Sequence, residues 1–169
     1  MSVLEFSLFL TFPAAMAFAG AMDLLTMTIP NRISIGLIIA FVAAAIAAPL
    51  GWTELASHVG AGALMLVVGI GMFSLGWLGG GDAKLLAAAA LWFGFEGLVQ
   101  YLVLVSIAGG ALALLIFSYR NLAPPLWLCR QDWAMRLHAK AGGIPYGIAL
   151  AAAGLWLYPS TPWLSSLVV

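Results

Sequence analysis

Charge is nearly absent from this chain. Its 169 residues include six acidic and six basic side chains, so 7% of the residues are charged and 64% are hydrophobic. The mean hydropathy is +1.12. A soluble domain carries about 25% charged residues, because its surface has to be hydrated. The composition therefore excludes a soluble domain and predicts an integral membrane protein.

The apolar runs are continuous, which predicts helices. Strands of a transmembrane barrel alternate polar and apolar residues, whereas a helix in lipid satisfies its own backbone and tolerates unbroken apolar sequence. At about 20 residues per span, residues 1–169 have room for a single all-α transmembrane domain. We expect about six transmembrane helices, over residues 6–22, 33–50, 57–78, 84–95, 97–118 and 144–158.

The basic residues predict the orientation of this bundle. Every lysine and arginine falls in one of three alternate connections, at 23–32, 79–84 and 119–143. The remaining connections and the N-terminal stretch carry glutamates and no basic residue. Because an excess of Lys and Arg marks the cytoplasmic side, we expect these three segments in the cytoplasm and both termini on the opposite side. The basic residues are Arg32, Lys84, Arg120, Arg130, Arg136 and Lys140, and the glutamates are Glu5, Glu54 and Glu96.

One stretch tests this orientation. Lys84 and Arg120 are expected on the same side, yet only 35 residues separate them. A single helix of that length would be roughly 50 Å long, too long for a hydrocarbon core of ~30 Å. Two crossings fit if the first is short and the chain reverses at Gly94-Phe95-Glu96-Gly97. A short crossing places its start, around Asp82, below the membrane surface or in a wet cleft.

The longest basic connection, 119–143, contains a further candidate helix. Asp132, Arg136 and Lys140 share one helical face at i, i+4 spacing, which is typical of an amphipathic helix lying on the membrane surface. An ordinary basic loop with interfacial tryptophans explains the same residues.

Two carboxylates stand out as candidate functional groups. Asp23 follows the first apolar run, and Asp82 follows the third. Acidic residues near membrane depth are costly and are usually functional, and the predicted orientation places both on the cytoplasmic face. The structural alternatives are that Asp82 caps the N-terminus of the fourth helix and that Asp23 is an ordinary polar residue at a helix end.

Two carboxylates on one face are sufficient for hydrolysis without a cofactor. When they share a site, the first ionisation opposes the second, so that one accepts a proton from water while the other donates a proton to the scissile carbonyl. Because the two carboxyl groups titrate as a pair, the sequence does not assign the acid role and the base role to one residue or the other. Gly79, Gly80 and Gly81 would permit a tight turn and a close approach by substrate backbone. Lys84 would contact a substrate carboxylate or act on the charge of Asp82.

The other polar residues predict no metal, cofactor or nucleic-acid site. Two carboxylates are fewer oxygen ligands than a hard cation requires. Cys129 is the single cysteine and cannot form an internal disulfide. His58 and His138 are expected to be structural, and a net charge of zero gives no sign of a nucleic-acid partner.

Three motifs resemble those of a known family. Asp23 followed by Ile29-Pro30-Asn31 reads D-x5-I-P-N, Gly79 to Lys84 reads G-x-G-D-x-K, and Gly143-Ile144-Pro145-Tyr146-Gly147 opens the last apolar run. Together they resemble the prepilin peptidases, membrane aspartic proteases of the GxGD type. The size of the chain is similar to the short branch associated with Flp (tight-adherence) pili.

The resemblance implies a specific reaction. Such enzymes remove a short basic leader from type IV prepilins or pseudopilins, after a glycine, at the cytoplasmic face of the bacterial inner membrane. Carried over, Asp23 and Asp82 are the catalytic pair, and the glycines 79–81 form the motif turn. Supporting positions are Pro30, Asn31, Lys84 and Pro145. The prepilin and membrane lipid are the expected partners.

The sequence departs from longer family members. They insert a cysteine-rich domain after the first span and also methylate the new N-terminus, whereas here residues 24–32 connect the first two spans. We therefore expect no methyltransferase activity. Three other functions compete with the peptidase: an ion-coupled transporter, a metal-dependent phosphoalcohol transferase, and a catalytically silent assembly component.

Overall fold

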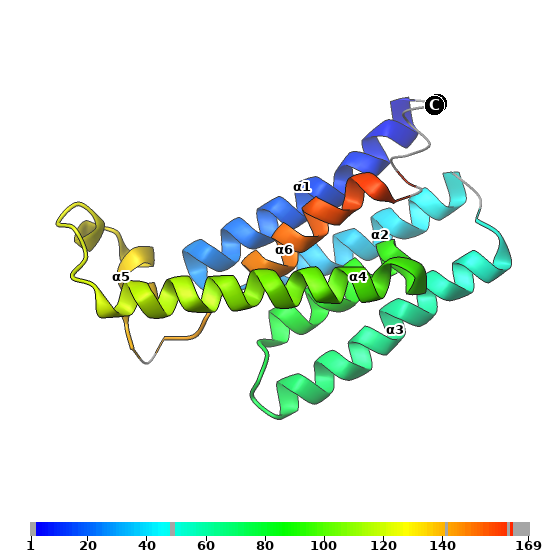
Figure 1. Ribbon diagram of the computed structural model, residues 1–169. Coiled ribbons are helices and arrows are strands. Elements are labelled where there is room, and N and C mark those ends of the chain that lie inside the picture. Colours follow the sequence, from blue (N-terminus) through cyan, green and yellow to red (C-terminus); the bar gives the residue numbers. More distant parts are fainter. Residues whose placement is uncertain (1–2, 48–49, 141, 162, 164–169) are drawn as a thin grey trace.

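The computed structural model describes residues 3–47, 50–140, 142–161 and 163, and helices are the only regular secondary structure in this part of the chain (Figure 1). The long helices are α1 (Val3–Thr26), α2 (Asn31–Ala47), α3 (Trp52–Ser74) and α4 (Gly80–Asn121). Shorter elements are η1 (Leu128–Arg130), α5 (Asp132–His138), α6 (Tyr146–Leu157) and η2 (Tyr158–Ser160). The predicted all-α class is confirmed. The predicted segments 33–50 and 119–143 include residues 48–49 and 141, which lie outside the described residues.

Three of these helices are long and apolar enough to cross a membrane, over Phe9–Thr26, Trp52–Ser74 and Gly80–Asn121. Helix α2 is apolar but shorter. Their outward faces carry large apolar side chains, among them Ile39, which is 63% exposed, and Val67, which is 69% exposed. Such a surface is unfavourable in water and stable in lipid. The chain is a membrane protein.

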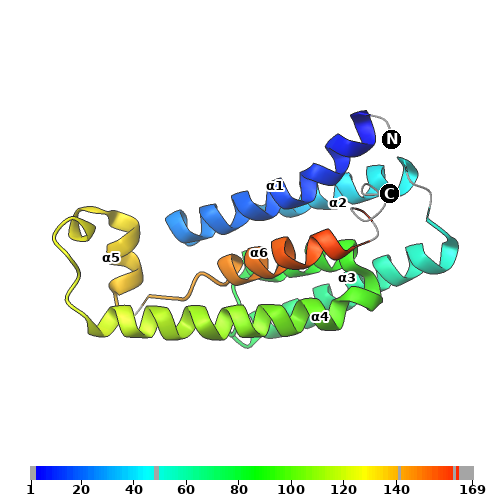
Figure 2. The ribbon, with the colours of Figure 1, turned by 45° about the horizontal axis from the view of Figure 1, so that its top comes forward.

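Helix α4 is a helical hairpin. Gly94 interrupts it with φ 59° and ψ −176°, a backbone conformation that side-chain-bearing residues rarely adopt. The chain reverses there, and Figures 1 and 2 both show the two limbs running back alongside each other. The predicted reversal at 94–97 is confirmed. At 1.5 Å per residue, limb 80–93 is about 20 Å long and limb 95–121 about 40 Å, so the second limb extends well beyond the start of the first.

The first limb of α4 forms the centre of the bundle. Helix α3 packs closely along it, since a Cβ added at Gly69 would lie 3.0 Å from the Ala83 Cβ. Helix α2 contacts it from another side, where Trp92 Nε1 donates a hydrogen bond to the Leu37 carbonyl over 3.2 Å. Helix α6 packs on α1 and on α4. Nearly every residue from Asp82 to Gly94 is therefore buried.

The connections sort onto two ends of the bundle (Figures 1 and 2). The α1–α2, α3–α4 and α4–α6 connections lie at one end, which we call the site end. The α2–α3 connection and the turn of the α4 hairpin lie at the other, which we call the aromatic end. There Phe12 stacks on Tyr158 with ring centroids 4.5 Å apart, and Trp92 and Trp163 lie 5.6 Å apart. The three predicted basic segments thus share one end.

The predicted helix boundaries are wrong in two places that matter. Helix α1 continues to Thr26, so Asp23 lies inside a helix and not in the connection 23–32. Helix α5 ends at His138 because Ala139 adopts an extended conformation. Lys140 is therefore outside the helix, and the predicted face running from Asp132 to Lys140 does not form.

Candidate active site

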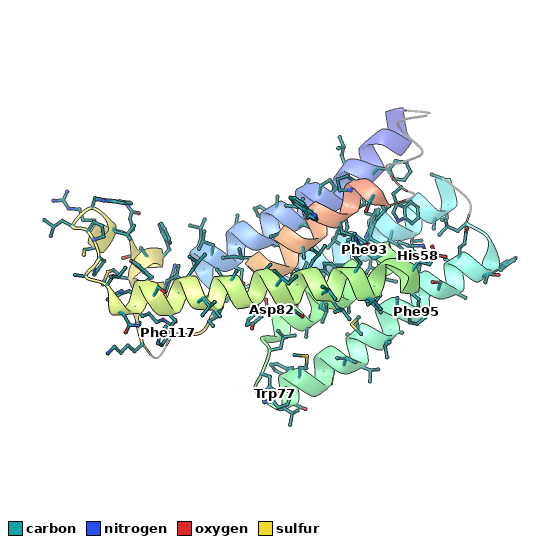
Figure 3. The ribbon with its side chains drawn as sticks, in the orientation of Figure 1. His58, Trp77, Asp82, Phe93, Phe95 and Phe117 are labelled. Atoms are coloured by element: carbon teal, nitrogen blue, oxygen red, sulfur yellow. The ribbon has the colours of Figure 1, made fainter. Side chains whose placement is uncertain are left out.

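Two helix ends bring the predicted carboxylates together. Asp23 lies in the last turns of α1 and Asp82 in the first turn of α4. Both are buried, with 4% and 9% of their surfaces exposed, and their charges interact. Figure 3 shows Asp82 at the start of the first α4 limb, far from His58 and Phe93 at the hairpin turn. Both carboxyl groups therefore lie at the site end, close enough for their charges to interact.

A third helix completes the site. Helix α6 begins after Pro145, and its early backbone amides have no partner within the helix. The Gly147 amide donates a 2.7 Å hydrogen bond to Asp23 Oδ2 and also lies near the Asp82 carboxyl, as does the Gly79 amide. The positive end of the α6 dipole favours negative charge at this position. One backbone amide therefore lies between the two carboxyl groups.

Gly147 is the site residue that sequence reasoning missed. It belongs to the third motif, in which the sequence points to Pro145 as the supporting position. The available signal was a proline followed by an apolar helix, which marks free backbone amides in the next turn. Nothing in the sequence indicated that these amides would face Asp23.

One carboxyl oxygen in the site is unsatisfied. Asp82 Oδ1 is buried and has no hydrogen-bonding partner in the described part of the chain. A buried polar atom without a partner costs free energy. A proton shared with Asp23, or a water molecule held between the carboxyl groups, satisfies this oxygen.

The glycines matter because they allow close packing. A Cβ added at Gly147 would lie 2.8 Å from Asp23 Oδ2, and one added at Gly79 would lie 2.7 Å from Asp82 Oδ2. A Cβ at Gly81 would lie 3.1 Å from the Ile29 Cβ. Any side chain at these positions would displace a carboxylate or the Ile29 loop.

The predicted glycine turn is only partly correct. Gly79 is extended and precedes α4, whereas Gly80 and Gly81 are already helical. The left-handed turn residue is Gly76, with φ 74°. The N-cap of α4 is Gly79, so the alternative that Asp82 is the N-cap is wrong. Asp82 is the third helical residue, and its carboxyl group lies back toward Gly79, since a Cβ added at Gly79 would be 2.7 Å from Asp82 Oδ2.

The supporting motif residues meet beside the site. Lys84 Nζ donates a 2.9 Å hydrogen bond to Asn31 Oδ1, joining the starts of α4 and α2. The Pro30 carbonyl accepts the first turn bond of α2 from Ile33, over 3.0 Å. Pro145 is fully buried at the start of α6. Each therefore holds a helix start at the site end.

Two arginines hold the segment that returns from the far end of α4 to α6. Arg120 Nε donates to the Leu137 carbonyl over 2.8 Å, and its Nη2 donates to the carbonyls of Gly142 and Gly143 over 2.7 and 2.9 Å. Arg136 donates to the Leu25 carbonyl, near the end of α1. The planar guanidinium suits such multiple bonding. This network lies a few residues from both Asp23 and Gly147.

The remaining polar residues lie apart from the pair. His58 Nδ1 is 2.6 Å from the Leu91 carbonyl and packs on Phe41, which fits the structural role expected for it. His138, at the end of α5, packs against Tyr119 of α4. Cys129 is exposed. In the described residues, no three His, Cys, Asp or Glu side chains cluster as metal ligands would.

Comparison with known proteins identifies the family. Residues 10–114, more than half of the chain, match the model of the type IV leader peptidase family. The match includes Asp23, Asp82 and the first two motifs, and ends before α6. Comparison with curated proteins and with solved structures finds no significant match. The resemblance drawn from the three motifs is therefore confirmed, and the chain belongs to the type IV leader peptidase family, which indicates a peptidase activity.

Proposed function

We propose that the chain is a prepilin leader peptidase in which Asp23 and Asp82 form the catalytic pair. The observation that carries the proposal is the burial of two carboxylates from distant helices around one shared amide, that of Gly147. Carboxylates buried without a basic partner are costly. A stability role gives no reason to place two of them together, whereas water activation requires it.

The chemistry follows from the pair sharing one proton. The ionised carboxylate removes a proton from a water molecule as its oxygen attacks the carbonyl carbon of the scissile bond. The protonated carboxyl donates its proton to the carbonyl oxygen. When the tetrahedral intermediate collapses, the carbon–nitrogen bond breaks and the leaving amine takes a proton from the pair. The Gly147 amide holds Asp23 in place throughout.

The substrate we propose is a Flp-type prepilin or pseudopilin, cleaved at the cytoplasmic face of the inner membrane. The family match and the short connection between α1 and α2 support this class. Since a helical peptide bond is poorly accessible, the junction between leader and apolar segment has to unwind at the site. Binding of the apolar segment beside the bundle concentrates and orients that junction.

A cleavage assay tests the catalytic pair. Purified enzyme and a Flp-type prepilin are combined in detergent or liposomes, and leader removal is read by mobility shift and N-terminal sequencing. We expect Asp23→Asn and Asp82→Asn each to lower the rate by about 10²–10⁴-fold. Asp132→Asn, which changes an exposed carboxylate at the start of α5, serves as the matched control. Substantial cleavage by either site variant would remove that residue from the pair.

The same preparation separates the peptidase from its rivals. Proton-driven uptake into liposomes without cleavage would indicate a transporter. Absence of cleavage with a correctly folded chain would indicate an assembly component. Prepilin cleavage that persists in the presence of a chelator would count against a metal-dependent transferase.

The single cysteine provides a test of orientation. Cys129 is exposed in η1, in the segment expected in the cytoplasm. A membrane-impermeant maleimide should label it in inside-out vesicles and leave it unlabelled in intact spheroplasts. The reverse pattern would place the site end on the outer side of the membrane.

A further inference from the structure

A groove opens between α2 and α3, on the side of α4 away from the aspartates. Both helices pack on the first limb of α4 but scarcely on each other. The space between them has a volume of about 440 Å³. We call it the α2–α3 groove; apart from Asn31, Ser34 and Lys84, its lining is entirely aliphatic or glycine.

The floor of the groove suits a helix. Gly62, Ala63, Ala87 and Ala88 line it, and small residues let a second helix approach closely within a membrane. The groove runs along α4 from Lys84 to Leu91, a distance of about two helical turns. The groove therefore matches the contact surface of one apolar helix.

An unpaired hydroxyl lies in the same place. Ser34 lines the groove and is 5% exposed, and its Oγ has no hydrogen-bonding partner in the described residues. A lipid acyl chain has no group that satisfies this hydroxyl. A polypeptide helix can bring a polar side chain to it.

The groove has one charged end. Lys84 lies there, and only one of its three ammonium protons is used by Asn31. An unneutralised ammonium beside an apolar surface attracts a carboxylate carried by the occupant. Among the groove-lining residues there is no acid to neutralise it.

We propose that the α2–α3 groove binds the apolar helix of the prepilin, with a carboxylate near its N-terminal end paired to Lys84. This inference rests on the proposed function. Lys84 and Asp82 differ by about 3 Å along the axis of α4, so the docked helix begins level with the catalytic pair. The groove then runs away from the site end, in the direction that a membrane-spanning substrate takes from its cytoplasmic leader.

The placement also defines the path of the cleaved segment. Two residues apart on a helix point to nearly opposite sides, so Lys84 and Asp82 face away from each other across α4. A helix is about 10 Å across, and three or four extended residues of about 3.3 Å each cover that distance. These substrate residues pass over Gly79, which is exposed and has no side chain.

Cross-linking tests the docking directly. A photo-reactive p-benzoylphenylalanine replaces Ile38 or Leu66, which line the groove, in an Asp82→Asn chain co-expressed with a Flp-type prepilin. Ile39 and Val67 are matched controls, since each is the next residue on the same helix, exposed and outside the groove. We expect prepilin adducts at 38 and 66 at least about fivefold above those at 39 and 67.

The other outcomes are equally informative. Equal adducts at all four positions, or phospholipid adducts alone at 38 and 66, would overturn the docking proposal. Cross-linking does not require cleavage. If the wild-type chain cleaves prepilin but the Asp82→Asn chain shows no such adduct pattern, the docking alone is refuted. If the adducts form but the wild-type chain never cleaves, the proposed function alone is refuted.

Kinetics provide a second test with the wild-type aspartates. Ala63→Phe fills the groove from an exposed position on α3. We expect it to raise KM for the prepilin about tenfold and leave kcat nearly unchanged, while Val67→Phe on the lipid-facing side changes neither. Equal KM values for the two variants would count against the groove.

A charge exchange tests the role of Lys84. Lys84→Glu should raise KM about tenfold for the natural prepilin. Changing one acidic residue in the first two turns of the prepilin's apolar segment to lysine should restore cleavage by this variant and impair cleavage by the wild type. No restoration at any such position would exclude the ion pair.

Discussion

Both ends of the bundle carry acidic side chains, but only the site end buries them. At the aromatic end a larger cavity, of about 620 Å³, is lined by Glu54, His58 and Glu96. Its carboxylates are exposed, and Glu54 accepts a hydrogen bond from the Gly51 amide at the start of its own helix, over 3.1 Å. At the site end Asp23 and Asp82 are withdrawn from solvent and interact with each other.

The difference shows that the larger cavity does not coincide with the proposed active site in this molecule. An exposed carboxylate keeps its water shell and can stabilise a helix start at little cost. A buried pair loses that water and has to share protons and hydrogen bonds instead. Convergence of titratable groups from distant helices is therefore the more reliable sign of the site, and each prediction below changes matched residues at the two ends or on the two surfaces.

Among the changes that compare the two ends, the largest expected effect is that of a change in carboxylate length. Asp23→Glu or Asp82→Glu keeps the charge but pushes the carboxyl group into a packed site, and a displacement of about 1 Å costs on the order of 10²-fold in rate. Glu54→Asp makes the reverse change at the aromatic end and should leave the rate within about twofold. The measurement is the prepilin cleavage rate; comparable effects at both ends would contradict the contrast.

The next effect concerns the shared amide. Gly147→Ala places a Cβ 2.8 Å from Asp23 Oδ2 and 2.7 Å from the Ile29 Cδ1. Overpacking of this kind costs about 1–3 kcal/mol, so we expect cleavage to fall about tenfold or more. Gly71→Ala is the control, because a Cβ there meets nothing within 4 Å on α3. An unimpaired Gly147→Ala enzyme would show that the amide does not position Asp23.

The hairpin turn should affect stability more than chemistry. Gly94→Ala forces a side chain into φ 59° and against His58 at 3.3 Å, a strain of about 1–3 kcal/mol. We expect a lower unfolding midpoint in a denaturing-detergent titration, with nearly normal cleavage by the fraction that remains folded. Gly110→Ala, on the open second limb, is the control. Loss of cleavage without loss of stability would link the aromatic end to the chemistry.

The smallest effect is expected at the return segment. Arg120→Gln removes the bonds to the Leu137, Gly142 and Gly143 carbonyls, which hold the chain leading to α6. We expect kcat to fall about fivefold, because the Gly147 amide is then less firmly placed. Arg130→Gln alters another arginine of the same connection, exposed in η1, and should have no effect. Equal rates for both variants would leave Arg120 with a folding role only.

Much of this architecture was predictable because membrane sequences are strongly constrained. Near-absence of charge predicted apolar helices, and the spacing of Lys84 and Arg120 predicted the reversal found at Gly94. The alternation of basic and acidic connections placed Asp23 and Asp82 at one end. These inferences rest on length and charge, which the bilayer makes decisive.

The orientation of helix faces was not predictable in the same way. The segments are apolar on all sides, so no periodic pattern marks which face is buried. That Asp82 faces α1 and α6 while Lys84 faces the α2–α3 groove appears only after the helices are packed. The predicted glycine turn was also too long. A glycine in a helix cannot be told from an extended glycine by sequence, and Gly80 and Gly81 belong to α4.

The sequence by itself determined that this chain is a helical membrane protein, that it reverses within its longest apolar stretch, and that two aspartates of the family motifs lie at one end. Only the tertiary structure decided that the Gly147 amide joins them. The reason is physical: charge and length act along the chain and are readable residue by residue, whereas a backbone amide becomes a ligand only when another helix presents an acid to it.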